Sequence, residues 1–141
     1  MAAKTRRNQA SPTPPDSEDR SRQKRAVLAR SLMRMFEFWQ LSTADQLVLL
    51  GLAEGNRTAL QRYASGEPIA GSRDALDRAG HLFGIQKNLE LLYPRNEDIQ
   101  RRWMSAPNRK FHNRRPVDVV SAYGLPGLVM VRGTLDAMRG A

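Results

Sequence analysis

The stretch GNRTALQRYASGEP, residues 55–68, decides how this chain folds. It opens with a glycine, continues with residues compatible with a short helix, and closes with Ser65-Gly66 and Pro68, a combination that ends a helix. Just before it, Ser42 is suited to cap a helix through TADQLVLLGL, and Gly51 and Gly55 would mark its end and the turn. The sequence therefore predicts two short helices joined by a glycine-containing turn.

The second of these helices, from about residue 56 to 64, has a polar face. At about 100° per residue, its polar side chains fall within an arc of roughly 140°, opposite its apolar ones. The polar residues are Arg57, Thr58, Gln61 and Arg62. A helix-turn-helix unit presents donors to DNA phosphates and base edges in this way. The solvated face of any short surface helix gives the same pattern, so both interpretations stay open.

Apolar residues recur at helical spacing on both sides of this pair. A first helix is predicted from about residue 21 to 41, with its inward face formed by Leu28, Leu32, Met35, Phe36 and Trp39. A longer helix is predicted after Ser72, with Leu76 facing inward and Gly84 bending or dividing it. Further helices are expected after Asn96, Pro116 and Pro126. No segment alternates as a strand does, so the fold is expected to be mostly α.

The composition suggests how the chain is organised. Residues 1–22 are rich in Pro, Ser and charge without apolar periodicity, which predicts a disordered basic arm. We expect a helix-turn-helix-like bundle over residues 23–68 and a second small helical domain over residues 69–141. Cysteine is absent and no apolar run approaches the ~20 residues of a membrane helix. These features predict a soluble cytoplasmic protein that does not associate with a membrane.

The charge favours a polyanion or an acidic protein face as partner. The net charge is +9, although residues 31–66, which include the polar helix, carry three basic and three acidic residues. The run RRWMSAPNRKFHNRR, residues 101–115, has no acidic residue and includes Trp103 and Phe111. Basic residues interleaved with aromatic ones can bind single-stranded nucleic acid, whereas a buried Trp103 would leave only a solvated basic rim. That rim could equally face an acidic protein.

An enzyme is not expected. The imidazoles are His81 and His112, and neither belongs to a metal-binding motif, a phosphate-binding loop or a recognisable catalytic triad. We therefore expect no catalytic residue, no metal site and no cofactor.

Several segments together resemble the Xre/MbcA/ParS antitoxin family. They are LLGL, RYASGEP, LFGIQKNLELLYP, WMSAPNRKFHNRRPVDVV and GLVMVRGTLDAMRG, between about residues 39 and 140. The most specific part is the series Trp103, Pro107, Asn108, Phe111, Pro116 and Asp118. This family commonly has a glycine two residues after the aromatic, where this chain has Asn113 after His112. Because asparagine tolerates a left-handed backbone, the turn should be preserved.

The resemblance implies a type II antitoxin with a helix-turn-helix unit followed by a toxin-binding domain. Its partner would be a RES-domain toxin that consumes NAD, encoded by an adjacent gene. The antitoxin would cover the active-site cleft of the toxin, as a homodimer or within a higher complex, and the complex could repress its own promoter at operator DNA. The alternatives are a stand-alone helix-turn-helix transcription regulator and a basic nucleic-acid-binding accessory protein.

The resemblance also places the toxin contacts in the C-terminal half. The expected toxin-binding residues are Asn108, Arg109, Phe111, Arg114, Arg115, Arg132, Asp136, Arg139 and Ala141. The apolar stripe of the last helix, Leu128, Val131, Leu135 and Met138, should anchor it and leave Arg132, Asp136 and Arg139 on or near its exposed side. Asp136 and the terminal carboxylate of Ala141 would then suit a cleft that holds dinucleotide phosphates, while Arg139 would meet an acidic residue.

Overall fold

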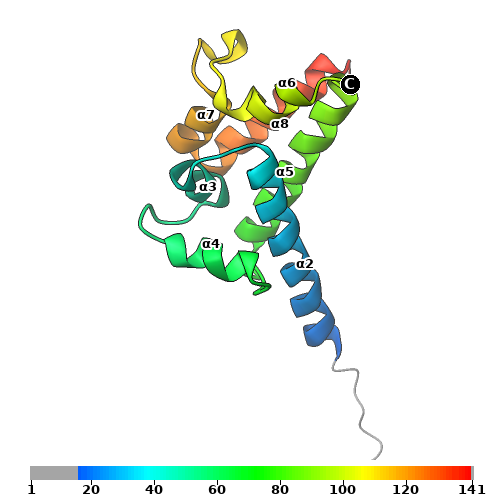
Figure 1. Ribbon diagram of the computed structural model, residues 1–141, viewed down its shortest axis with the longest axis vertical. Helices are drawn as coiled ribbons and strands as arrows, with labels where there is room; N and C mark the ends of the chain where they lie inside the picture. Colours follow the sequence, from blue (N-terminus) through cyan, green and yellow to red (C-terminus); the bar gives the residue numbers. More distant parts are fainter. Residues whose placement is uncertain (1–15, 141) are drawn as a thin grey trace, which may run out of the picture.

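The computed structural model describes residues 16–140 and shows an all-α arrangement, as the sequence predicts. In these residues there are seven α-helices (Figure 1): α2 (Asp16–Phe38), α3 (Thr43–Leu50), α4 (Arg57–Ala64), α5 (Arg73–Leu92), α6 (Glu97–Arg102), α7 (Pro116–Tyr123) and α8 (Leu125–Met138). Two 3₁₀ turns, Trp103–Ser105 and Arg109–Phe111, lie between α6 and α7. The β-type pairing in this part of the chain is one isolated bridge between Asn108 and Arg114.

The helix starts follow from capping side chains that the sequence predicts. Ser42, Ser72 and Asn96 each accept a hydrogen bond from the backbone N–H three residues ahead. Pro116 occupies the first turn of α7, where its missing N–H costs nothing. These local signals fix where the helices begin.

Helix α2 is longer than expected at its start. It begins at Asp16, so residues 16–22, which the sequence assigns to the arm, are helical instead. This segment is polar on all sides and gives no apolar period, but acidic Glu18 and Asp19 in the first turns favour a helix electrostatically. Arg25 connects the helix to the segment that follows α4, because its Nη1 donates to the carbonyl of Ile69 at 2.8 Å. Residues 1–15 of the predicted arm lie outside the described residues.

A single hydrophobic core runs through the molecule. It includes Phe36 and Trp39 from α2, Leu82 and Leu89 from α5, and Leu128 from α8, each almost fully buried. Helix α5 packs against α2 and α8, and α8 also packs against α7 (Figure 1). The two halves of the chain are therefore joined by shared packing rather than by a flexible linker.

Two features of α5 differ from the expectation. Gly84 does not divide the helix, which is continuous from residue 73 to 92. The glycine instead lets a side chain approach closely, since a Cβ added there would lie 2.4 Å from Cζ of Arg132 on α8. Leu76 does not face the core, because 40% of its surface is exposed. No helix in the described part of the chain is long and apolar enough to cross a membrane.

Candidate functional site

The polar face of α4 is at the surface. Arg57, Thr58, Gln61 and Arg62 are all exposed, while Ala59 and Leu60 on the opposite side are buried. Asn56 caps the helix through its side chain, which accepts from the Ala59 N–H. Arg62 forms an exposed ion pair with Glu67 at 3.4 Å, an interaction weak enough for a phosphate to displace.

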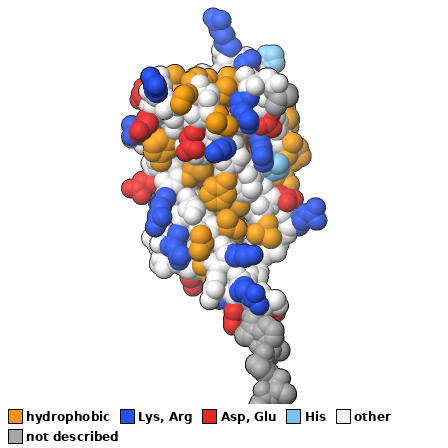
Figure 2. Space-filling view, turned by 90° about the vertical axis from the view of Figure 1, so that its right-hand side faces the viewer, with side chains coloured by type: hydrophobic (Ala, Val, Ile, Leu, Met, Phe, Trp, Pro, Cys, Tyr) orange, Lys and Arg blue, Asp and Glu red, His pale blue; other side chains and the backbone are white. Residues whose placement is uncertain are grey.

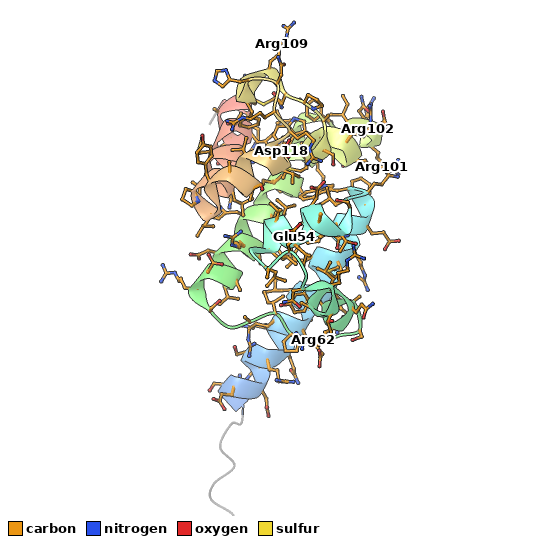
Figure 3. The ribbon with its side chains drawn as sticks, turned by 90° about the vertical axis from the view of Figure 1, so that its left-hand side faces the viewer. Glu54, Arg62, Arg101, Arg102, Arg109 and Asp118 are labelled. Atoms are coloured by element: carbon orange, nitrogen blue, oxygen red, sulfur yellow. The ribbon has the colours of Figure 1, made fainter. Side chains whose placement is uncertain are left out.

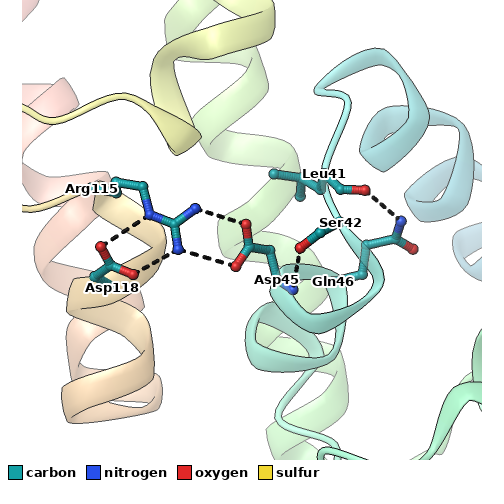
Figure 4. A network of polar contacts seen from close by, with 6 residues as sticks. All are labelled: Leu41, Ser42, Asp45, Gln46, Arg115 and Asp118. Atoms are coloured by element: carbon teal, nitrogen blue, oxygen red, sulfur yellow. Dashed lines mark hydrogen bonds and ion pairs between the residues drawn. The ribbon is translucent and has the colours of Figure 1, made fainter.

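Helix α3, which precedes α4, is held at its N-terminal end by an arginine from the far half of the chain. Arg115 donates to both carboxylate oxygens of Asp45, at 2.9 and 3.3 Å, and to both oxygens of Asp118, at 3.0 and 2.7 Å (Figure 4). Ser42 caps the same turn by accepting from the backbone N–H of Asp45 (Figure 4). The hydrogen bonds from Arg115 lower the pKa of Asp118, and both carboxylates raise the pKa of Arg115. The guanidinium expected to contact a toxin is thus engaged within the chain.

A second arginine holds the other end of α3. Arg78 on α5 is buried, pairs with Asp74 at 2.9 Å, and donates to the Leu49 carbonyl at 3.3 Å. Gly51 leaves room for it, because a Cβ there would lie 2.6 Å from Cζ of Arg78. The first helix of the helix-turn-helix pair is therefore fixed at both ends by arginines that follow it in the chain.

The segment between Asn108 and Arg115 is a compact turn. The Asn108 side chain accepts from the Lys110 N–H at 2.9 Å, and the Asn108 backbone N–H donates to the Arg114 carbonyl at 3.1 Å. His112 and Asn113 adopt left-handed backbone angles, with φ of 57° and 65°. The expectation that asparagine preserves this turn is confirmed.

The predicted toxin-binding residues of this turn differ in exposure. Phe111 is 5% exposed and packs edge-on against the buried Trp103 at 6.2 Å, so its ring supports the turn and is not a free surface contact. Arg114 lies over the exposed Tyr123 ring. Arg109 is exposed and points away from the body, at the opposite end of the molecule from Arg62 (Figure 3).

Arg132 and Asp136 on α8, and Arg139 at its C-cap, are hydrogen-bonded to α5. Arg132 lies 3.5 Å from the Gly80 carbonyl, which it donates to, and 3.4 Å from Nδ1 of His81. The buried Asn88 donates to Asp136 at 2.9 Å and accepts from Arg139 at 2.7 Å. Asp136 is half-buried and Arg139 is exposed. Ala141 lies outside the described residues.

Reasoning from the sequence missed three features. Arg78 and Asn88 are buried polar residues that hydrogen-bond to residues far away in the chain, Leu49 and Asp136, and no local pattern indicates these bonds. The third is the outward face of α8, which is apolar and which the spacing of Val129, Met130, Gly133 and Ala137 could have revealed.

One face of the molecule carries side chains of mixed chemistry. On the face shown in Figure 2, Lys and Arg side chains are scattered among acidic and hydrophobic ones. Among the residues that the structure describes, no group of three or more His, Cys, Asp or Glu side chains could hold a metal ion.

Two family models match the chain in succession. Residues 20–84 match the antitoxin Xre-like helix-turn-helix domain, and residues 88–141 match the antitoxin Xre/MbcA/ParS C-terminal toxin-binding domain. The chain belongs to the Xre/MbcA/ParS antitoxin family. Members of this family act by binding and are not enzymes, in agreement with the expectation from the residue inventory.

The two family matches meet within a helix. The first ends at residue 84 and the second begins at residue 88, both within α5. Helix α5 therefore belongs to both units, which explains their common core. The chain is also 29% identical over 110 residues to "Uncharacterized protein y4oB" of Sinorhizobium fredii, covering 78% of this chain and 82% of that protein.

Proposed function

We propose that this antitoxin neutralises a RES-type, NAD-consuming toxin encoded by an adjacent gene and represses their common promoter. The observation that carries the proposal is the succession of the two family domains, helix-turn-helix and toxin-binding, in one chain. The antitoxin would act by stoichiometric binding, with no chemistry of its own. The RES identity of the toxin comes from the family resemblance of the C-terminal half.

The geometry supports a separation of the two activities. The exposed α4 face and the 108–115 turn lie at opposite ends of the molecule, as the positions of Arg62 and Arg109 show (Figure 3). One antitoxin could therefore engage DNA at one end and a toxin at the other. The hydrogen bonds of Arg115 and Arg78 to the two ends of α3 would keep the orientation of the helix-turn-helix pair constant relative to the rest of the antitoxin in such a complex.

DNA binding would use Arg57, Thr58, Gln61 and Arg62 on α4. Arginines of this kind contact phosphates, while threonine and glutamine can reach base edges. Because the segment around α4 has balanced charge, we expect DNA affinity to depend on two copies of the unit in a complex rather than on one chain.

The test is neutralisation of the product of the adjacent gene. The purified toxin is mixed with NAD and increasing antitoxin, and the NAD that remains is measured. We expect full protection of NAD near one antitoxin per toxin, and copurification of the two proteins. If the toxin is neither bound nor inhibited while the antitoxin still binds DNA upstream of its gene, the stand-alone regulator is the correct function.

A further inference from the structure

Helix α8 presents three chemically different faces. Its inner face, Leu128, Val131, Leu135 and the half-buried Met138, packs into the core. One flank carries Arg132, Asp136 and Arg139, all of which contact residues of α5. These polar side chains already have partners within the chain, so they do not form an uncommitted surface for a partner.

The outer face of α8 is apolar and uncovered. At about 100° per residue, its side chains fall within an arc of roughly 100°, on the side opposite the core stripe. They are Pro126, Val129, Met130, Gly133 and Ala137, all exposed. Val129 is 46% exposed and Met130 is 50% exposed, although both are large apolar side chains. We call these five residues the outer stripe.

Two small residues make the outer stripe suited to close packing. Gly133 and Ala137 are one helical turn apart, and a Cβ added at Gly133 would meet nothing within 4 Å. Small residues at this spacing let the backbone of a partner approach, while Val129 and Met130 supply apolar area beside them. Methionine adapts its shape to an irregular surface, which suits an interface.

We propose that the outer stripe of α8 is the toxin-docking surface, and that an apolar segment of the toxin packs on it with its backbone against Gly133. This proposal rests on the proposed function and names its contact surface. The toxin is the occupant we commit to because the whole of α8 lies within the toxin-binding domain, residues 88–141. The proposed toxin contact is therefore the apolar side of α8 rather than its polar residues.

The test places a long side chain at Gly133 to obstruct the outer stripe and compares it with a matched control. G133Q places a long side chain on the outer stripe, and G80Q places the same side chain on α5, where an added Cβ also meets nothing within 4 Å. Both positions are exposed and helical, so both variants should fold and gain slightly in helix stability. Circular dichroism and thermal melting check this directly.

Affinity for the purified product of the adjacent toxin gene is measured by calorimetry for the wild type and both variants. We expect G133Q to lose at least about tenfold in affinity, as for a central interface position, and G80Q to change less than about twofold. Wild-type affinity in a folded G133Q overturns the inference and leaves the proposed function intact. If in that case G133Q also turns a wild-type dimer into a monomer, the outer stripe joins two antitoxin copies. Absence of wild-type binding overturns both the proposed function and this inference.

Discussion

Helices α4 and α8 are both short surface helices whose sequences show polar residues on one side, yet they use these residues differently. On α4, Arg57, Thr58 and Gln61 are exposed, and the buried residues Ala59 and Leu60 lie on the opposite side of the helix. On α8, Asp136 and Arg139 are bound to the buried Asn88, and the face left open is apolar. The DNA-facing candidate surface is thus polar, whereas the candidate toxin surface is hydrophobic.

The difference between α4 and α8 shows that a polar residue indicates a binding site only when its hydrogen bonds are not already satisfied within the fold. A side chain whose hydrogen bonds are satisfied within its own fold must break them before it binds a partner, and that costs about 1 kcal/mol or more for each bond. An exposed apolar side chain loses nothing of this kind and gains from leaving water. Packing, rather than polarity, therefore decides which side of α8 is available.

The strongest test of this comparison contrasts two glycines of α8. A Cβ at Gly127 would lie 2.5 Å from the Val119 carbonyl oxygen, whereas one at Gly133 meets nothing. Gly127→Ala should therefore lower the free energy of unfolding by about 1–3 kcal/mol through overpacking against backbone. Gly133→Ala should raise it by up to about 1 kcal/mol, since alanine favours a helix.

Urea unfolding of both variants measures these opposite signs. Stabilisation by both substitutions would mean that α8 and α7 are not in close contact at Gly127. Destabilisation by Gly133→Ala would mean that the outer stripe is covered within the chain, and the contrast between α4 and α8 would lose its basis.

A smaller effect concerns the ion pairs of Arg115, which join Asp45 of α3 to Asp118 of α7. Because Arg115 lowers the pKa of Asp118, ionised Asp118 stabilises the fold above the ordinary carboxyl pKa of 3.8. That contribution is lost as the pH falls through the lowered pKa of the folded state. Asp118→Asn should therefore cost under about 1 kcal/mol near pH 7, given the exposure of the pair, with the difference from wild type shrinking below about pH 4.

Unfolding free energies of wild type and Asp118→Asn between neutral pH and pH 2 provide the measurement. The acid limb of the wild type should be the steeper of the two. Parallel acid limbs would show that the ion pair between Arg115 and Asp118 contributes nothing to folding.

The fold could be predicted from the sequence where its signals are local. Ser42, Ser72 and Asn96 act as caps, Pro116 begins a helix, and the stripe from Leu128 to Leu135 is buried as its spacing predicts. The polar arc of α4 is also exposed as predicted. Each of these features depends on neighbours within about one helical turn.

The features that escaped prediction depend on residues distant in sequence. Arg115 reaches Asp45 across 70 positions, and Arg139 reaches Asn88 across 51. From the sequence alone, Gly84 suggests a break in the helix. In the fold it makes room for Arg132 of α8. Periodicity identifies which face of a helix is buried, but it cannot reveal which polar side chains find partners inside the fold.

The central claim is that this antitoxin binds DNA through the polar face of α4 and a toxin through the outer stripe of α8. One panel tests it: affinities for the purified toxin and for a duplex from upstream of the gene, measured for wild type, the double variant Arg57→Ala/Arg62→Ala, and G133Q. The account predicts that the double variant keeps its toxin affinity but binds DNA more weakly, with a salt slope smaller by about two. G133Q should lose toxin affinity and keep that for DNA. If either variant is folded and loses both affinities, or if the double variant binds DNA like the wild type, the account is contradicted.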